Sequence, residues 1–295
     1  MTPVSLWQVS IVTDAAQERR AAECLSRCFA EPVSCYADFE RGQIVVSVYA
    51  RIRPGLELLH RLERVLASES AAVKGGGLRI EVRFLRSRDW ANAWKRHFKP
   101  ISVGRKLLVK PGWSKSPPVP GQRVIVLDPG LSFGTGQHPT TRFCLGQIVA
   151  HRPGSIGKSF LDVGTGSGIL AIAARKLGYS PVDAVDHDPT AIRIAGGNAR
   201  RNRVQVRIRQ GDVARLGEKE RAEGYDLVCA NLVSDLLIKH ARRLAGRVRS
   251  GGRLVLAGIL EIEFGQVRAV YEGLGWRLSG SRKVREWRSG VFVGI

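Results

Sequence analysis

The stretch FLDVGTGSGIL, residues 160–170, decides the fold. Its apolar beginning has the pattern of a strand that ends at Asp162, and three glycines follow at alternate positions, from Gly164 to Gly168, before a helical pattern. Glycine in a strand-to-helix turn lets the backbone turn sharply and approach a ligand closely. The dinucleotide fingerprint G-x-G-x-x-G would need a glycine at position 169, where the sequence has Ile169. The stretch therefore predicts a ligand-binding glycine loop of another kind.

Strand-like and helical segments alternate from this loop to the end of the chain. Strands are expected at residues 160–163, 181–186, 204–210, 225–232, 253–260, 276–281 and 291–295, and helices at 168–178, 189–202, 236–248 and 264–274. Strands interleaved with helices of these lengths predict an α/β fold with a mostly parallel sheet. Ligands of such folds bind at the carboxyl ends of the strands, where the glycine loop is expected to lie.

The first 87 residues have a different pattern, in the order β-α-β-β-α-β. Strands are expected at residues 6–12, 33–39, 44–49 and 78–84, and helices at 15–29 and 56–66. This order predicts a small α+β domain with the ferredoxin-like plan, in which two helices pack on one face of a four-stranded sheet. Because no catalytic constellation occurs in it, we interpret residues 1–87 as a substrate-recognition domain.

A linker is expected between the two patterns, at residues 88–121. Trp90, Trp94 and Phe98 recur every four residues, which predicts a helix with one aromatic face, and residues 111–121 are rich in Pro, Gly and Ser. The aromatic face is expected to pack onto a domain rather than to stack on bases. We therefore predict a linker helix and loop at residues 88–121 and a catalytic domain at residues 122–295.

The formal net charge of +21 is the unusual feature of the composition. Such a charge attracts nucleic acid and other polyanions, although here it is spread over the whole chain. The densest patch, residues 199–210, alternates Val204, Val206 and Ile208 with polar residues. This alternation predicts a half-buried strand with an arginine-rich outer face. We favour a solvated face for this patch over a dedicated RNA-binding groove.

Cysteines and histidines indicate neither redox nor metal chemistry. The five cysteines include no C-x-x-C pair, and the six histidines form no ligand-spaced cluster with them. The sequence has no apolar run long enough to span a bilayer, and its N-terminus lacks the pattern of a signal peptide. We expect a soluble, cytoplasmic protein without a metal site.

The glycine loop, with an acid two residues before it, resembles motif I of S-adenosylmethionine-dependent methyltransferases. Asp186 ends the next strand, about twenty residues after the glycines, where a carboxylate can accept hydrogen bonds from both hydroxyls of a ribose. Asp188 precedes a proline and a helical pattern, so it is expected to be a helix N-cap. Asp212 follows the third strand, where it either meets the adenine amino group or is a plain turn aspartate.

Asn231 emerges from an apolar strand at the carboxyl edge of the predicted sheet, where the transferred methyl group should face its acceptor. The N-P-P-Y motif of methyltransferases that act on planar amide or adenine nitrogens is absent, which favours a tetrahedral amine acceptor. We expect the side-chain carbonyl of Asn231 to orient this amine. No dedicated general base is visible, so catalysis is expected to come from positioning and desolvation.

A second Gly-Thr-Gly triplet lies in LDPGLSFGTGQHPTT, residues 127–141. It lacks the strand and acid partner of the first loop and is followed by Pro139, which suits the first turn of a helix. We expect this loop to cover the methionine end of the cofactor. Hydrogen-bond donors for an amino-acid carboxylate at this helix N-terminus are offered by Thr135, His138, Thr140 and Thr141.

A series of motifs, in this order, resembles the PrmA family, the ribosomal protein L11 methyltransferases. The motifs are DWxxxWKxxFKP (89–100), DPGLSFGTGQHPTT (128–141), LDVGTGSGILAIAARKLG (161–178), DHDP (186–189), ANL (230–232), GGRLVLAGIL (251–260) and the pair Glu286-Trp287. The resemblance is close from Asp89 onward and covers the first 88 residues in outline. It implies an S-adenosylmethionine-dependent N-methyltransferase of lysine side chains and α-amines of ribosomal protein L11. The implied architecture is a small substrate-recognition domain followed by a seven-stranded, Rossmann-like methyltransferase domain.

The resemblance also implies which residues contact the cofactor. By motif position they are Thr141, Gly164, Asp186 and Asn231, and Gly166 belongs to the same glycine loop as Gly164. Asn231 is the residue expected to have a catalytic role.

Two other functions remain open. The first is lysine methylation of another protein, since the PrmA-like methyltransferases of electron transfer flavoprotein resemble the catalytic half; the separate N-terminal domain favours the ribosomal substrate. The second is an RNA-binding protein or RNA methyltransferase that uses the arginine surface. It predicts binding that weakens steeply with salt, and the absence of N-P-P-Y argues against a base nitrogen as the target.

Overall fold

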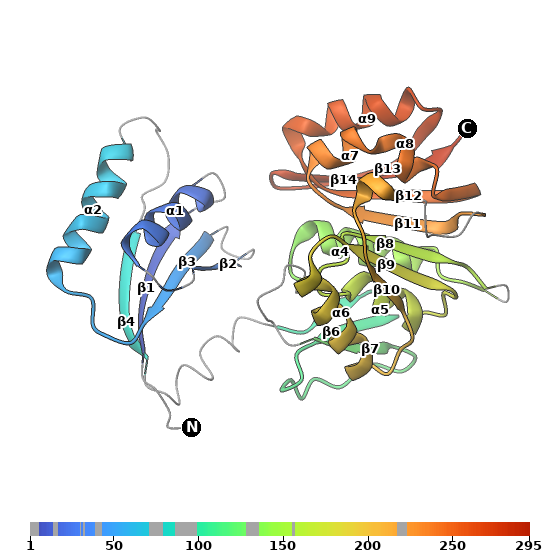
Figure 1. Cartoon of the computed structure of the whole chain (residues 1–295). Coiled ribbons are helices and arrows are strands. Elements are labelled where there is room, and N and C mark those ends of the chain that lie inside the picture. Colours follow the sequence, from blue (N-terminus) through green and yellow to red (C-terminus); the bar gives the residue numbers. More distant parts are fainter. Residues whose placement is uncertain are drawn as a thin grey trace. The chain divides into compact units, whose positions relative to one another are not determined.

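The structure is a computed structural model that describes residues 6–13, 17–29, 31, 33–38, 43–70, 79–85, 99–127, 136–154, 157–216 and 223–295. The chain divides into two compact units, Met1–Phe98 and Lys99–Ile295 (Figure 1). The aromatic residues Trp90, Trp94 and Phe98, expected on a linker helix, lie outside the described residues.

The N-terminal unit has the expected order of elements. These are β1 (Leu6–Thr13), α1 (Glu18–Cys28), β2 (Ser34–Asp38), β3 (Gln43–Ala50), α2 (Leu56–Ser70) and β4 (Arg79–Leu85). The strands form a four-stranded sheet in the order β2-β3-β1-β4, and every neighbouring pair is antiparallel. Both helices cover the same face of this sheet, because alternate residues of β1 and β3 pack with one apolar side of each helix (Figure 1).

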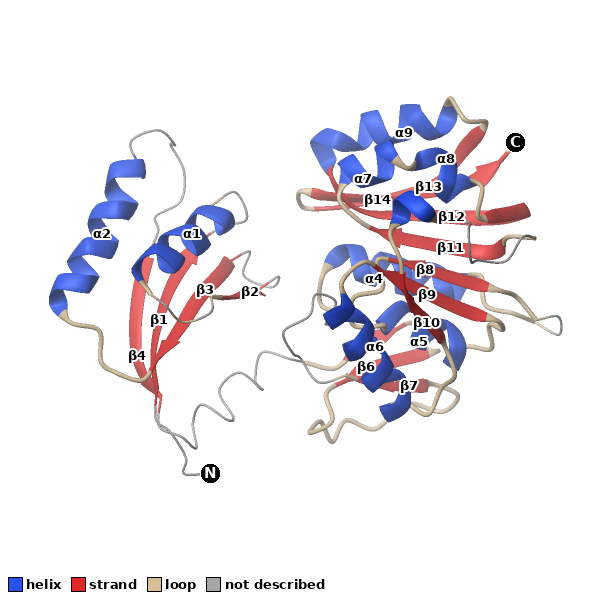
Figure 2. Cartoon of the chain, viewed as in Figure 1, coloured by secondary structure: helices blue, strands red, loops and turns tan. Residues whose placement is uncertain are grey.

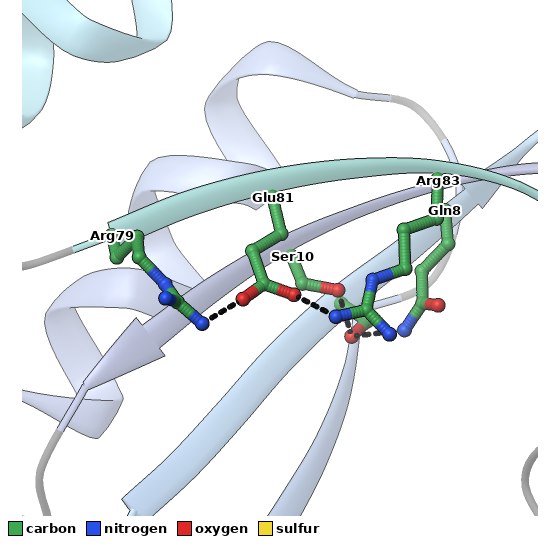
Figure 3. A network of polar contacts seen from close by, with 6 residues as sticks. Gln8, Ser10, Arg79, Glu81 and Arg83 are labelled. Atoms are coloured by element: carbon green, nitrogen blue, oxygen red, sulfur yellow. Dashed lines mark hydrogen bonds and ion pairs between the residues drawn. The ribbon is translucent and has the colours of Figure 1, made fainter.

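The opposite face of the N-terminal sheet carries a group of polar side chains beside the apolar residues Val12, Val45 and Tyr49. It presents Gln8, Ser10, Ser47, Arg79, Glu81 and Arg83 (Figure 3). The hydroxyls of Ser10 and Ser47 lie 2.8 Å apart across β1 and β3, and Glu81 forms an ion pair with Arg83 at 2.7 Å. This polar surface belongs to the sheet itself and is the face that the two helices leave uncovered.

The second unit begins with a small three-stranded sheet. Its strands are β5 (Ile101–Val103), β6 (Leu107–Lys110) and β7 (Arg123–Val126). Two of them fall within residues 88–121, which we interpreted as linker helix and loop. Buried side chains of this sheet, such as Leu107 and Ile125, join the core of the second unit.

A seven-stranded mixed sheet forms the centre of the second unit (Figure 2). Its strands are β8 (Phe160–Val163), β9 (Val182–Asp186), β10 (Arg207–Gln210), β11 (Tyr225–Asn231), β12 (Val248–Leu260), β13 (Trp276–Val284) and β14 (Trp287–Gly294). The order is β10-β9-β8-β11-β12-β14-β13, and β14 runs opposite to the other six strands. The predicted α/β fold with a mostly parallel sheet is confirmed.

Helices cover both faces of this sheet. They are α4 (Pro139–Ala150), α5 (Ile169–Lys176), α6 (Pro189–Arg201), α7 (Ser234–Lys239), α8 (Ala241–Ala245) and α9 (Phe264–Glu272). Buried residues of α4, α5 and α6 form one core layer, and those of α7, α8 and α9 form the other. The carboxyl ends of the parallel strands therefore lie between two helical layers, where this class of fold binds its ligands.

Two predicted elements differ from the structure. The helix expected at 236–248 is instead the two short helices α7 and α8, because the backbone of His240 leaves the helical region at φ −110° and ψ 20°. The strand expected from Val204 begins only at Arg207. Arg203 has φ 54°, and the amide of Val204 donates to the carbonyl of Ala199, so these residues still close helix α6. No helix within the described residues is long and apolar enough to cross a membrane.

Candidate active site

The candidate site lies at the carboxyl ends of three neighbouring strands. β9, β8 and β11 are adjacent and parallel, and they end at Asp186, Val163 and Asn231. Their registers place the first residues of the glycine loop, directly after Val163, between Asp186 and Asn231. The sequence-predicted residues of these three strands are therefore brought together.

The glycine loop has a backbone that favours glycine. Gly164, Gly166 and Gly168 have φ angles of 75°, 51° and 82°, in the left-handed region. A Cβ atom at Gly164 would lie 2.4 Å from the Cδ2 atom of Leu232, and one at Gly168 would lie 3.0 Å from the Cβ atom of Ala195 on α6. Side chains at these positions would therefore push the loop away from the end of β11 and from α6.

Asp186 is held by backbone amides at the end of β9. Its Oδ2 atom accepts a hydrogen bond from the amide of Gly166 at 2.8 Å, and its Oδ1 atom accepts one from the amide of Asp188 at 3.1 Å. The two bonds fix the plane of the carboxylate, and each oxygen keeps a lone pair for a further donor. Asp188 itself caps α6 through a 2.7 Å hydrogen bond from the amide of Thr190, which confirms its predicted role.

Asp162 is a residue that the sequence interpretation did not assign to the site. It is fully buried at the end of β8, and its Oδ2 atom accepts hydrogen bonds from the Thr165 hydroxyl at 2.7 Å and from the Ala171 amide at 3.2 Å. Its Oδ1 atom has no partner in the structure. Burial raises the pKa of Asp162 to about 7, although the two hydrogen bonds oppose this shift. The signal in the sequence was the acid itself, because a carboxylate that ends an apolar strand needs a polar partner.

Thr141 lies in the first turn of α4 and is almost fully buried. Its hydroxyl oxygen has no hydrogen-bond partner. Pro139 occupies the first turn, as predicted, and the Nδ1 atom of His138 caps the helix by accepting from the amide of Thr140. A buried hydroxyl without a partner costs free energy unless a ligand supplies one, so Thr141 fits the predicted cofactor contact.

The surroundings of His138 fit a structural role better than the predicted role of donating a hydrogen bond to the carboxylate of a ligand. Its ring makes an edge contact with Trp287, with 4.8 Å between the centroids, and burial lowers the pKa of His138 to about 4 against the opposing charge of Glu286. The imidazole is therefore neutral at physiological pH, which is the form that can accept the cap hydrogen bond. This contact joins the start of α4 to the turn between β13 and β14.

Asn231 is partly exposed at the end of β11 and has no side-chain hydrogen bond to any residue that the structure describes. A Cβ atom at Gly258 would lie 3.1 Å from its Oδ1 atom, so the glycine of β12 leaves room for this side chain. A Cβ atom at Gly164 would lie 3.7 Å from the backbone carbonyl oxygen of Asn231. The backbone of Asn231 is thus adjacent to the glycine loop, and its side-chain amide is available to a ligand.

Two further predicted residues remain without support as ligand contacts. Asp212 is exposed, and its Oδ1 atom accepts a 2.8 Å hydrogen bond from the amide of Ala214 as the N-cap of the short helix η2 (Val213–Arg215), which is the turn role weighed as the alternative. Thr135 lies outside the described residues, as does most of the second glycine loop. Gly136, the last residue of that triplet, is described. A Cβ atom there would lie 3.0 Å from Ile169 at the start of α5.

The polar groups of this site fit an elongated ligand with donors along its length. Two buried oxygen atoms without partners, on Thr141 and Asp162, lie at the ends of elements that surround the glycine loop, and Asp186 offers a fixed carboxylate on its other side. A sulfonium nucleoside with an ammonium group and ribose hydroxyls has donors of this kind. Among the described residues no group of three His, Cys, Asp or Glu side chains could hold a metal ion.

Comparisons with known proteins agree with this geometry. The sequence profile of one family, described as "Ribosomal protein L11 methyltransferase (PrmA)", matches residues 5–293. A protein of Pelotomaculum thermopropionicum named "Ribosomal protein L11 methyltransferase" is 42% identical over 219 residues, which are 73% of this chain and 68% of that protein. A protein of Geobacter sulfurreducens with the same name is 43% identical over 202 residues, 68% of this chain and 64% of that protein.

A solved structure is similar to this chain as well. The structure described as ribosomal protein L11 methylase from Lactobacillus delbrueckii subsp. bulgaricus has a TM-score of 0.60 and 27% sequence identity, and the match covers 67% of this chain and 99% of that chain. The similarity supports the α/β methyltransferase fold of the second unit with its seven-stranded mixed sheet.

Proposed function

The chain belongs to the ribosomal protein L11 methyltransferase (PrmA) family, and from this membership we propose that it transfers methyl groups from S-adenosylmethionine to lysine side chains and α-amines of ribosomal protein L11. The observation that carries this proposal is the fixed carboxylate of Asp186 beside the glycine loop, with Asn231 on the other side of that loop. One carboxylate and one amide at adjacent strand ends provide separate places for a nucleoside and for an acceptor amine.

The cofactor is held by residues at the ends of β8 and β9 and at the start of α4. Asp186 accepts hydrogen bonds from the ribose hydroxyls, while Gly164 and Gly166 let the backbone approach the nucleoside. Thr141 donates from the start of α4 to the amino-acid carboxylate, and Asp162 accepts from the ammonium group through its free oxygen. Thr135 and Asp212 stay secondary candidates, for the amino acid and for the adenine.

Asn231 positions the methyl acceptor. S-adenosylmethionine supplies a methyl group that its sulfonium already activates, so the chain has to place and desolvate the amine. The side-chain carbonyl of Asn231 accepts a hydrogen bond from the amine and thereby directs its lone pair away from the Asn231 oxygen. The lysine loses its proton to water before it is aligned, and a pocket that is poor in water lowers its pKa.

We assign substrate recognition to the N-terminal unit, as a domain of the ferredoxin-like type. The order of its elements, the strand order β2-β3-β1-β4 and the two helices on one face support this assignment. Its polar sheet face, with Glu81 between Arg79 and Arg83, offers charges of both signs to a protein partner (Figure 3). On this proposal the protein acts in the cytoplasm, where ribosomal proteins are made.

Two alternatives would keep the same site but change the acceptor. One is a lysine of another protein, such as electron transfer flavoprotein, and the other is RNA. No residue of the site favours either alternative over the ribosomal protein, and the absence of the N-P-P-Y motif argues against a base nitrogen.

Incubation with labelled S-adenosylmethionine separates these acceptors. The purified protein is given free ribosomal protein L11, intact ribosomes, electron transfer flavoprotein or ribosomal RNA in parallel, and the labelled residues are located by mass spectrometry. We expect label on lysines and the α-amine of free ribosomal protein L11. The variant Asn231→Ala should bind the cofactor within about twofold of the unaltered chain but turn over at least about tenfold more slowly, because it loses one positioning hydrogen bond. Label on RNA or flavoprotein alone would remove the proposed substrate.

A further inference from the structure

The two edges of the seven-stranded sheet differ in charge. Carboxylates gather at the carboxyl edge, namely Asp162, Asp186, Asp188, Asp212, Asp235, Glu261, Glu263 and Glu286. The amino edge, where β8 to β12 begin and the preceding helices end, has few carboxylates among the described residues. Two of these, Asp183 and Asp226, are already paired with arginines. Within the described part of the second unit, the carboxylates therefore lie mostly on the side of the candidate active site.

Basic residues at the amino edge come first from the ends of helices. Helix α4 is followed by Arg152, α5 ends with Arg175 and Lys176, α6 ends with Arg200 and Arg201, and α8 contains Arg242 and Arg243. Positive side chains near a helix C-terminus stabilise it through the macrodipole and by capping its carbonyl groups, as Arg152 does by donating to the carbonyl of Val149. This effect explains part of the charge.

Further basic residues at this edge lie in loops and at strand starts, where the macrodipole gives no reason for them. They are Lys158, Arg207, Arg247 and Arg249, of which Arg207 and Arg249 pair with Asp183 and Asp226. Basic groups at this edge lie close enough to affect one another's pKa. The pKa of Lys176 is lowered, first by burial and then by Arg123, and the pKa of His151 is lowered, first by burial and also by Arg253 and Lys158. Positive charge at this density destabilises the folded chain unless an anion compensates it.

Four exposed arginines of this edge have no carboxylate partner among the described residues. Arg200 and Arg203 lie at the end of α6, and Arg242 and Arg243 lie on α8, in the other helical layer. They are thus spread over both sides of the sheet edge rather than confined to one turn. Guanidinium groups match phosphate oxygens with two parallel hydrogen bonds, which favours a phosphate backbone over isolated carboxylates as the partner.

We propose that the amino edge of the seven-stranded sheet is a docking surface for RNA, held through its phosphate backbone by Arg200, Arg203, Arg242 and Arg243. Bound there, the RNA contacts the edge opposite the carboxyl edge that holds Asp186 and Asn231, so it is a partner of the protein and not its methyl acceptor. The acidic carboxyl edge stays free to attract a cationic lysine. This surface is separate from the methyl-transfer site, so the proposal does not depend on the identity of the methylated substrate.

The test measures the binding of a fluorescein-labelled RNA hairpin by anisotropy, without cofactor, over about 50 to 200 mM salt. The test variant combines Arg200→Gln, Arg203→Gln, Arg242→Gln and Arg243→Gln. The control variant removes four positive charges elsewhere, through Arg61→Gln and Arg64→Gln on α2 and Arg282→Gln and Lys283→Gln on β13, where all four side chains are exposed. Thermal unfolding checks that both variants are folded.

We expect the test variant to bind RNA at least about tenfold more weakly than the unaltered chain and the control variant to lose at most about twofold. The slope of log affinity against log salt should decrease by about 3 in the test variant, because each lost phosphate contact removes about 0.7 to 0.9. Equal losses in the two variants, or no RNA binding by the unaltered chain at the lower salt concentration, would overturn the proposal. Binding of poly-glutamate as tight as that of RNA would also overturn it, in favour of an acidic protein.

Discussion

The carboxyl edge and the amino edge of the same sheet are built from the same strands and helices but differ in chemistry. At the carboxyl edge, side chains with free acceptor or donor capacity meet: Asp186, Thr141, Asp162 and Asn231. At the amino edge, basic side chains predominate: Arg152 caps a helix, Arg207 and Arg249 pair with carboxylates, and four exposed arginines have no carboxylate partner among the described residues. On our proposals, one mixed sheet separates a binding site for a small cationic molecule from a surface for a polyanion, and the difference teaches that each region can be tested without disturbing the other.

The largest effect is expected from Asp186→Ala. Loss of hydrogen bonds from two ribose hydroxyls to a charged acceptor costs about 3 kcal/mol or more, which weakens cofactor binding at least about 100-fold. Isothermal titration with S-adenosylhomocysteine measures this loss. The matched variant Asp188→Ala removes the cap of α6, which costs about 1 kcal/mol of stability, but it should keep the affinity within about twofold. Equal losses of affinity in the two variants would contradict the assignment of the ribose to Asp186.

The next largest effect is expected from Gly164→Ala. The new methyl group would lie 2.4 Å from the Cδ2 atom of Leu232, and the residue would keep a φ of 75°. The backbone strain costs about 1 to 3 kcal/mol in the free energy of unfolding, and the displaced loop should weaken the cofactor at least about tenfold.

The variant Gly178→Ala is the control for Gly164→Ala. Gly178 follows α5 with φ 96°, and a Cβ atom there would have nothing within 4 Å. It should show similar backbone strain in thermal unfolding but bind the cofactor normally. A normal affinity in Gly164→Ala as well would mean that the loop does not approach the ligand.

A smaller effect is expected from pH, through Asp162. Its pKa of about 7 in the free chain means that it is mostly protonated below this pH, and an incoming ammonium group favours the ionised form. Cofactor affinity should therefore rise about tenfold per unit as pH increases toward 7 and then level off. Because the folded chain binds the proton more tightly than the unfolded chain, the contribution of Asp162 to stability should decrease as pH rises from 3.8 to about 7. Asp162→Asn should remove both dependences, and their persistence in this variant would assign them to another group.

The smallest effect on the cofactor is expected at the amino edge. The variant with Arg200, Arg203, Arg242 and Arg243 changed to Gln should bind S-adenosylhomocysteine within about twofold of the unaltered chain, since exposed charges at the opposite edge are screened by solvent and salt. A loss of cofactor affinity comparable to that of Asp186→Ala would show that the two edges of the sheet are coupled, and would contradict their independence.

Much of the carboxyl edge could be predicted from the sequence because its features are local. The glycines at alternate positions and Asp186 at the end of the next strand lie within one strand-helix-strand segment, so spacing along the chain places them in space. Asn231 could be placed once β11 was identified as a strand of the same sheet. The cap of α6 by Asp188 follows from a single turn of chain.

Other features depend on contacts between distant segments, which spacing does not reveal. The burial of Asp162, which leaves one of its oxygens without a partner, depends on how α5 packs over the end of β8. The strands β5 and β6 lie within residues 88–121, which we interpreted as a linker helix and loop. They form a sheet because β6 pairs with β5 and β7 and because their apolar side chains are buried against the second unit. The concentration of arginine at one edge appears only when the ends of separate helices are brought together.

The most direct test of the account is a crystal structure of the chain with S-adenosylhomocysteine. We expect the ribose hydroxyls on the carboxylate of Asp186, the amino group within hydrogen-bonding distance of the Oδ1 atom of Asp162, the amino-acid carboxylate on the Thr141 hydroxyl, and the sulfur atom facing Asn231. A nucleoside bound away from the glycine loop at Gly164, or with its sulfur directed away from Asn231, would contradict the proposed site.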